Sequence, residues 1–548
     1  MRQEKLDKNQ AFFGSAFLVG AGTFLSRILG LVREQVFAYF FGAGMATDAF
    51  QIAFRIPNLL RDLFAEGAMS SSLVPVYLKL RHDKGDQEAW KLVSNVVSTL
   101  GLVLSSLTLV GILFSGPLVH FYAPTFAGIP GKQELAASLT QILWPFLPMV
   151  VFAAVWMGVL NARDKYKAPA LAPSIFNVIS IASAFLICPM VSKIWGLHPI
   201  YGMAIGATFG GLGQWLIQVP ALYREGYRFS FFINLKDPAL NKMILLMGAG
   251  TFGLAATQIN IFVNSVLASS QGNGAISWLN YAFRLMQFPI GVFGVAISTV
   301  TLTRVSKEAA NNDFVSIRKS VQESMGMVFA LTIPSAFGLA LFGFPIISVI
   351  YEHGRFTIED SYSTAMALAA YSLGLSAYSG IKVLVPILYS LNKAKAAIFS
   401  SGLSVILNLC LGIPLVHAWG FKGLPVSTSC SSLVSFLVLF FLVNKYVQNL
   451  PWKKISSSLI KSVISSVIMS LWLVFVLNVA GIPVFRPIAL TSWWVKATFF
   501  SHLCFLMGSL VVAVVIYAFA AKKMGLNEID RITNILWKRL RRNNRELK

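Results

Sequence analysis

Long apolar stretches, separated by short polar segments, recur along the whole chain. Clear examples are Val96–Leu113, Ile175–Met190, Leu433–Val443 with its flanking residues, and Leu503–Ala520. A helix needs about 20 apolar residues to cross a hydrocarbon core of about 30 Å, and several stretches approach or reach that length. The pattern predicts an all-α polytopic membrane protein with about 14 transmembrane helices.

Composition supports this prediction. Hydrophobic residues make up 56% of the chain and charged residues only 12%, about half the charged fraction of a typical soluble domain. Arg2, Lys5 and Lys8 precede an apolar run that contains Arg27 and has no obvious cleavage site. We therefore expect a retained first helix rather than a cleaved signal peptide.

The basic residues that give the net charge of +23 are distributed unevenly between the two sides of the predicted membrane. Of the 45 lysines and arginines, 33 fall in segments on one side of the predicted membrane, six on the other side and six within spans. By the positive-inside rule, this asymmetry predicts that both termini lie in the cytoplasm. We expect the basic tail from Lys522 to lie on anionic headgroups, and we expect no nucleic-acid partner.

Four short motifs recur in order at an offset of 228 to 229 residues, which indicates an internal repeat. The matches are Gly20–Phe24 with Gly248–Phe252, Ala53–Arg55 with Ala282–Arg284, Pro117–Tyr122 with Pro345–Tyr351, and Lys165–Lys167 with Lys393–Lys395. An even number of spans in each unit makes the two repeats parallel. Such a duplicated bundle is typical of alternating-access transporters.

The repeat predicts four parts. We expect an N-terminal six-helix lobe over residues 1–230 and a C-terminal six-helix lobe over residues 231–450. Two additional transmembrane helices follow over residues 451–521, and residues 522–548 form a basic cytoplasmic tail.

Charged residues inside the first two predicted spans are the main candidates for function. A charged side chain at the bilayer centre costs about 2.5–3.5 kcal/mol on insertion scales, so such residues usually have a role. The matching positions of the second repeat are nearly all neutral, so the fold does not require these charges. The candidates are Arg27, Arg33, Glu34, Asp48, Arg61, Asp62 and Glu66, with Arg284 as the main contribution of the second repeat.

An excess of arginine in a dehydrated cavity indicates an anionic ligand, because guanidinium groups bind phosphate bidentately. We expect the acids to neutralise the arginines when the site is empty and to exchange partners when substrate binds. Two alternatives stay open, a fixed structural ion-pair network and arginines that snorkel near span ends. Arg55, whose repeat partner is Arg284, and Lys382 also stay open between a cavity role and a structural one.

Helix geometry groups these residues. Ser26 and Arg33 are seven residues apart, as are Arg27 and Glu34, so each pair shares a helix face. Arg27 and Arg33 lie about 120° apart around a straight helix and converge only if it bends. Gly30 lies between them and is the expected bend of a gate.

No metal-ligand cluster, phosphate-binding loop or Ser-His-Asp arrangement is evident in the sequence. We therefore expect neither catalytic residues nor a metal or other cofactor. A membrane potential or a coupling ion of unknown identity is left as the energy source. The glycines Gly206 and Gly210 predict close helix packing rather than nucleotide binding.

Six strings of residues carry a family resemblance. They are Ser26–Gly30, Phe41–Phe50, Pro57–Arg61, Phe64–Gly67, Tyr281–Pro289 and Tyr351–Thr357. They resemble the MurJ (MviN) family of lipid II flippases, part of the multidrug/oligosaccharidyl-lipid/polysaccharide exporter superfamily. The likeness covers nearly the whole chain, and the string Gly-Ala-Gly-Met-Ala-Thr-Asp at residues 42–48 is specific.

The resemblance implies two six-helix lobes and two extra helices that form a groove for a polyprenyl tail. The implied substrate-binding residues are Arg27, Arg33, Arg61, Arg284 and Asp48, to which we add Ser26 and Ser277, the repeat counterpart of Asp48. The implied gate residues are Glu34 and Glu66, with Gly30. The chain departs from the family at Phe283 and Gln287, where many members have acids, and at Asp62, where an arginine is common.

We therefore expect a flippase that moves lipid II, an undecaprenyl-diphosphate-linked peptidoglycan precursor, from the inner to the outer leaflet of the bacterial cytoplasmic membrane. The expected partners are lipid II or a similar anionic polyprenyl-diphosphate lipid, membrane lipids and the cell-wall synthesis machinery. The alternatives are an exporter of another polyprenyl-linked oligosaccharide, a drug/cation antiporter, a membrane enzyme acting on lipid-linked sugars, and a scaffold that transports nothing.

Overall fold

The computed structural model describes residues 2–64, 68–482, 494 and 498–530, except for the side chains of residues 2–17, 68, 70, 71 and 249–257. The chain divides into two compact units. The first comprises residues 1–274 with residues 354–356, and the second comprises residues 275–353 and 357–548. The two units are defined by which residues pack together, whereas the predicted lobes were defined by the repeat in the sequence. The predicted domain boundaries therefore stay a prediction.

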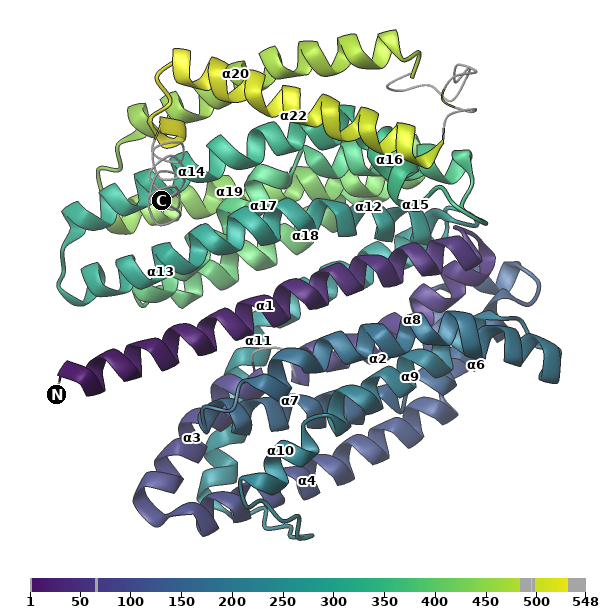
Figure 1. Cartoon of the computed structure of the whole chain (residues 1–548), viewed down its shortest axis with the longest axis vertical. Coiled ribbons are helices and arrows are strands. Elements are labelled where there is room, and N and C mark those ends of the chain that lie inside the picture. The colour runs from purple at the N-terminus through teal and green to yellow at the C-terminus, as the bar shows by residue number, and fades with distance from the viewer. Residues whose placement is uncertain (1, 65–67, 483–493, 495–497, 531–548) are drawn as a thin grey trace, which may run out of the picture. The chain divides into compact units, whose positions relative to one another are not determined.

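The first unit contains eleven α-helices and one 3₁₀ turn within the described residues (Figure 1). Within it, α1 packs along α8, α2 packs against α6, and α11 packs against α3. The elements are α1 (Arg2–Phe41), α2 (Met45–Phe64), α3 (Ala68–Lys84), α4 (Asp86–Leu113), α5 (Ser115–Tyr122), η1 (Pro124–Gly128), α6 (Lys132–Leu143), α7 (Phe146–Ala162), α8 (Lys167–Trp195), α9 (Ile200–Leu216), α10 (Val219–Arg224) and α11 (Pro238–Ser269).

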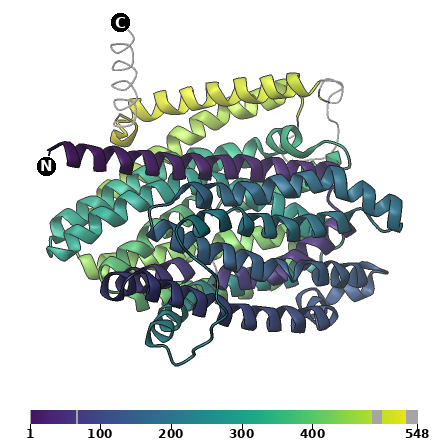
Figure 2. The same cartoon turned by 60° about the horizontal axis from the view of Figure 1, so that its bottom comes forward.

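The described part of the second unit is also helical. Here α12 packs against α16 and α18 against α19, while α20 packs against both α14 and α22 (Figures 1 and 2). The elements are α12 (Ala275–Pro289), the π-helical turn η2 (Ile290–Gly294), α13 (Val295–Ala310), α14 (Phe314–Leu341), α15 (Gly343–Tyr351), α16 (Ile358–Ser372), α17 (Leu375–Ser390), α18 (Ala394–Trp419), the 3₁₀ turn η3 (Gly420–Lys422), α19 (Gly423–Val447), α20 (Trp452–Val479) and α22 (Phe499–Lys523).

The order of elements repeats as the sequence predicted. Helices α4 and α14 both have 28 residues, and α14 begins 228 residues after α4. The short helices α5 and α15 follow at the same interval. The pair α6 and α7 likewise corresponds to α16 and α17, which form a pair bent by 47°. The all-helical duplicated fold is therefore confirmed.

Only some of the described helices have the length and apolar composition that a membrane span needs. By length and composition, eight of the described segments are able to cross a membrane, or nine if the bent pair α16–α17 counts as one span. One of these segments, Ala394–Val447, contains both α18 and α19. The predicted count of about 14 is not confirmed.

Glycines on α9 allow it to pack closely against α8. A Cβ atom at Gly206 would overlap the side chain of Ser183, and one at Gly210 would lie 2.8 Å from a ring carbon of Phe176. Such approach is typical of small residues at helix interfaces in membranes. The predicted packing role of these glycines is confirmed.

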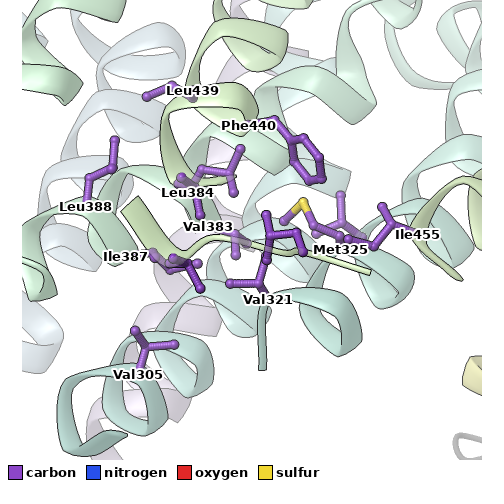
Figure 3. Packing of buried hydrophobic residues seen from close by; sticks show 14 of the residues in the cluster. Val305, Val321, Met325, Val383, Leu384, Ile387, Leu388, Leu439, Phe440 and Ile455 are labelled. Atoms are coloured by element: carbon purple, nitrogen blue, oxygen red, sulfur yellow. The ribbon is translucent and has the colours of Figure 1, made fainter. Parts of the chain in front are cut away.

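Apolar side chains from six helices form a core cluster in the second unit (Figure 3). Val305 of α13, Met325 of α14, Leu384 of α17, Phe440 of α19 and Ile455 of α20 all lie in this cluster, and none is more than 5% exposed. Helix α20 has no counterpart in the first repeat. This cluster fixes it to helices that do have such a counterpart. Helix α20 lies within residues 451–521, for which the sequence predicts two additional transmembrane helices.

Candidate functional site

Arg33 and Glu34 of α1 form an ion pair. Arg33 Nη2 donates to Glu34 Oε1 at 2.6 Å, and the two side chains are 19% and 12% exposed. The guanidinium of Arg33 also lies over the ring of Phe176 in α8, 5.3 Å from its centre. Arg33 is thus held in a half-buried position by a neighbouring acid and an aromatic ring, an environment in which guanidinium groups bind anions well.

The other α1 candidates lie along the contact with α8. Asn177 of α8 donates from Nδ2 to the backbone oxygen of Ser26 at 3.1 Å. A Cβ atom at Gly30 would lie 3.8 Å from the same Asn177 amide. Arg27 is exposed, so the structure holds Arg27 and Arg33 in different environments. Helix α1 is unbroken across Gly30, and the predicted bend there stays a prediction.

Arg61, near the end of α2, pairs with the acid that follows it. Its Nε and Nη2 atoms donate to Asp62 Oδ1 at 3.1 and 2.5 Å. Gln258 of α11 donates to the other oxygen of Asp62 at 3.2 Å. Arg61 is 26% exposed and Asp62 16% exposed. This arrangement leaves the arginine accessible while its counter-charge is tied to α11.

Arg55 occupies the same interface one to two turns earlier. Its Nη1 donates to Ser265 Oγ of α11 at 2.9 Å, and Ser265 in turn donates to the backbone oxygen of Ile261. Arg55 therefore links α2 to α11 in the first unit. This contact supports the structural alternative for Arg55.

Asp48 is completely buried and forms a clasp with Lys132, Asn273 and Gly274. Lys132 Nζ donates to Asp48 Oδ2 at 3.2 Å, and both side chains are 0% exposed. The backbone N–H of Gly274 donates to the same oxygen at 2.7 Å. Lys132 also donates to Asn273 Oδ1 at 2.8 Å. We call this group the Asp48 clasp.

A fourth side chain completes the clasp, since the ammonium of Lys132 lies 4.3 Å from the ring centre of Phe126. A buried ion pair of this kind is stable only where further hydrogen bonds satisfy both charges, and here they do. The clasp joins α2, α6, η1 and the segment after α11. Asp48 thus faces protein in this structure, and its predicted contact with substrate stays a prediction.

Lys132, Asn273 and Gln258 were missed by the sequence reasoning. Lys132 is one of the six basic residues predicted on the external side, and it follows the string Gly-Ile-Pro-Gly. One signal was available, because Lys132 maps onto Asp360 at an offset of 228 while Asp48 maps onto Ser277 at an offset of 229. Where the first repeat has an acid on α2 and a lysine on α6, the second repeat has a serine and an acid, so the lysine occurs together with Asp48.

The second unit presents the remaining candidates. Arg284 of α12 is exposed and Ser277 is buried. Next to Ser277, Trp278 donates from Nε1 to Asp360 Oδ1 at 2.8 Å, and Asp360 also caps α16. Lys382 of α17 is exposed. Glu66, a predicted gate residue, lies outside the described residues.

Within the described residues, no group of three or more His, Cys, Asp or Glu side chains has an arrangement that fits a metal ion. Arg33 of α1 and Arg61 of α2 instead each pair with the acid that follows in the chain. Arginine pairs of this kind can exchange a carboxylate for a phosphate, because both accept the same guanidinium fork.

Comparison with known proteins identifies relatives. A family model described as lipid II flippase MurJ matches residues 37–488. A relative from Vibrio cholerae, named probable lipid II flippase MurJ, is 36% identical over 434 residues, which cover 78% of this chain and 82% of that one.

Solved structures point to the same group. One titled lipid II flippase MurJ, inward closed conformation, is 26% identical, covers 92% of this chain and 98% of its own, and has a TM-score of 0.74. An inward-facing multidrug resistance MATE family transporter of the MOP superfamily is 12% identical and has a TM-score of 0.65, with coverage of 77% of this chain and 94% of that one. The second likeness shows a shared fold.

Proposed function

We propose a transport function for this chain, which belongs to the lipid II flippase MurJ family. The protein moves lipid II from the inner to the outer leaflet of the bacterial cytoplasmic membrane by alternating access. The half-buried Arg33 and Arg61, each already paired with an acid, carry the proposal. A diphosphate is the part of such a substrate that these arginines recognise.

The proposed binding step is an exchange of partners. Arg33 leaves Glu34, Arg61 leaves Asp62, and each guanidinium turns to a phosphate oxygen of the substrate. The net gain is the difference between two similar charge-assisted interactions. Substrate is therefore captured without being held too tightly to be released. The released carboxylate of Asp62 keeps its hydrogen bond to Gln258, which limits the cost of separating the pair.

Arg27 and Arg284 are proposed as further phosphate ligands, since both side chains are exposed. Ser26 and Ser277 are proposed as neutral hydrogen-bonding groups for the head of the substrate, and Gly30 and Glu66 as gate residues. The Asp48 clasp is proposed to hold the first unit together on the periplasmic side. The positive-inside rule supports this assignment of sides, with both termini in the cytoplasm.

A membrane potential or coupling ion is proposed to drive the cycle. The cell-wall synthesis machinery is proposed to supply and consume the substrate. Drug export is a weaker proposal for this chain, because an arginine-rich surface repels the cationic compounds that drug exporters usually handle.

The test is a lipid II translocation assay in cells depleted of their own flippase. Arg33→Ala and Arg61→Ala are expected to abolish translocation while the protein inserts in wild-type amounts. Arg33→Lys is expected to reduce translocation about tenfold, the loss of one charge-assisted hydrogen bond.

Arg81→Ala is the matched control, because Arg81 also pairs with an acid, Asp86 at 2.8 Å, but lies on α3 outside the α1–α2 surface. It is expected to transport normally. Normal translocation by both alanine variants at Arg33 and Arg61 would overturn the proposal.

A further inference from the structure

The first unit contains an apolar cavity of about 540 Å³. It is lined by α4, α7, α9 and α10 and by the segment after α10, and it includes Gly101, Phe152, Trp156 and Trp215. Ligand pockets in proteins have volumes of about 300–1,000 Å³, so the cavity has room for a flexible hydrocarbon chain. None of the substrate-binding candidates in α1 or α2 lines it.

An extended segment forms one wall of this cavity and is bound to α4 through its backbone. Asn95 of α4 exchanges two hydrogen bonds with the backbone of Asn234, at 2.8 and 2.9 Å. The backbone N–H of Phe232 donates to Ser98 Oγ at 3.2 Å. These polar side chains of α4 satisfy backbone groups that no helix satisfies, so the segment is fixed without regular secondary structure.

The segment carries large apolar side chains on its outer surface. Phe229 and Phe231 line the cavity yet are 51% and 75% exposed, and Leu235 is 62% exposed. Non-helical backbone is not tolerated against the hydrocarbon core, so an exposed segment of this kind belongs at headgroup level. Aromatic residues flanked by Arg228 and Lys236 are typical of that layer.

Basic side chains lie at the rim of the cavity. Arg228 donates from Nη1 to the backbone oxygens of Tyr223 and Tyr227, both at 2.8 Å, and its guanidinium lies 5.0 Å from the ring centre of Tyr223. Both bonds use the same nitrogen of an exposed side chain, so Nε and Nη2 make no hydrogen bond to the described residues. Arg224, next to the cavity-lining Tyr223, is also exposed.

The neighbouring acid does not cancel this positive rim. Glu225 binds Lys165 at 3.0 Å through Oε1 and Arg163 at 3.1 Å through Oε2. Both oxygens are therefore used by other cations. The two arginines on either side of Glu225 are left to attract an anion from outside.

We propose that this cavity binds one acyl chain of an anionic membrane phospholipid, whose phosphate is held by Arg224 and Arg228. The apolar interior takes the hydrocarbon, and the positive rim, at headgroup level, takes the negative group. A bound lipid bridges α4, α7 and α10 and stabilises that end of the first unit. The site lies apart from the residues proposed to bind the transported substrate, so it does not depend on the proposed function.

The test is photolabelling of the full-length protein in phosphatidylcholine vesicles. The probe is phosphatidylglycerol with a diazirine at the end of one acyl chain, and phosphatidylcholine with the same labelled chain is the neutral comparison. Labelled peptides are identified by mass spectrometry. We expect labelling within residues 97–105 of α4 and 152–156 of α7, with the anionic probe favoured about tenfold, the effect of one hydrogen bond between charged groups.

Two sets of variants separate the chain from the headgroup. Gly101→Leu fills the cavity, and a Cβ atom there meets only Phe152 within 4 Å, at 3.6 Å. Ser105→Leu, one turn further along α4, is a second filling variant. Both should remove the labelling, whereas Gly402→Leu, at a helical glycine with nothing within 4 Å, should keep it. Arg224→Gln combined with Arg228→Gln should reduce the anionic probe to the level of the neutral one.

The outcomes are decisive. Wild-type labelling elsewhere in the chain would overturn the site, and equal labelling by both probes would overturn the headgroup assignment. Stronger protection of these peptides by lipid II than by unlabelled phosphatidylglycerol would replace the proposed occupant with the substrate. Because the wild-type map decides the location alone, a filling variant that does not fold leaves the proposal testable.

Discussion

Replacing Lys132 with methionine removes one charge from the Asp48 clasp while keeping the length of the side chain. Lys132 and Asp48 are 0% exposed and 3.2 Å apart. After the change, the Asp48 carboxylate keeps the N–H of Gly274 at 2.7 Å but loses its counter-charge. Methionine still packs against Phe126, so the effect reports on charge rather than on a cavity.

The expected loss is large for a single residue. Breaking a buried ion pair by removing one partner destabilises a protein by about 3–5 kcal/mol, because the other charge is left buried and uncompensated. At about 2 °C for each kcal/mol in a unit of this size, the apparent Tm of the first unit should fall by about 6–10 °C. Lys193→Met, at an exposed lysine also predicted to be external, should change it by about 1 °C or less.

The assay is thermal unfolding of the purified protein in one detergent, at one heating rate because membrane proteins often unfold irreversibly. Asp48→Asn should also lower the Tm, since it leaves the Lys132 ammonium without its anion. The double variant Asp48→Asn/Lys132→Met removes both charges and should lie several degrees above either single variant. Additive losses in the double variant, or a wild-type Tm for Lys132→Met, would refute the reasoning.

The same double variant separates stability from transport. If Asp48 serves only the clasp, the double variant regains translocation together with stability. If the carboxylate also contacts substrate, as the sequence predicted, the double variant is stable but inactive. A translocation assay on a protein of near-normal Tm therefore tests the predicted role of Asp48 directly.

Two further predictions concern packing and pH. Gly206→Ala should lower the Tm by several degrees, because the added Cβ atom overlaps Ser183. Gly402→Ala, where a Cβ atom meets nothing within 4 Å, should raise the Tm slightly, because alanine favours the helix more than glycine does. Equal effects of the two changes would contradict the packing argument. Hydrogen bonds from Lys165 and then from Arg163, with desolvation opposing them, hold the pKa of Glu225 below its ordinary value of 4.5. The folded carboxylate therefore binds protons less readily than the unfolded one, so its stabilisation is complete above about pH 5 and is lost as pH falls through the lowered pKa. Glu225→Gln should show a smaller loss of Tm between pH 5 and pH 3 than the wild type, and parallel curves would count against this.

Helix order was predictable because it depends on patterns that are local in the sequence. Apolar length gives the spans, and the repeat offset gives the match of α4 with α14 without any knowledge of contacts. The number of spans was less predictable. Several described helices are short or interrupted, as where α16 and α17 meet at a bend, and hydropathy alone does not tell one broken span from two.

The partners of the candidate charges were less predictable than the charges themselves. Arg27 and Glu34 share a helix face, but seven residues at 1.5 Å per residue separate them by about 10 Å along the axis. Arg33 lies next to Glu34 in the chain, and its long side chain reaches the carboxylate at 2.6 Å. The shared helix faces therefore identified the part of α1 that carries the candidate charges, but not which of these charges form ion pairs. Lys132 is 84 residues from Asp48, and hydropathy places it only at the end of a span.

The repeat resolves what hydropathy leaves open at the Asp48 clasp. In the first unit an acid on α2 meets a lysine on α6, and in the second unit an acid on α16 meets Trp278 on α12. The contact between α2 and α6 thus contains an ion pair. The corresponding contact between α12 and α16 contains a hydrogen bond from a neutral donor to a carboxylate. Since the second arrangement holds its helices without a buried cation, the contact itself does not require one. The lysine in the first unit is explained by Asp48, whose charge must be balanced at 0% exposure. The presence of Asp48 is therefore not explained by helix packing alone. Translocation by the stable double variant Asp48→Asn/Lys132→Met measures whether the carboxylate also serves transport.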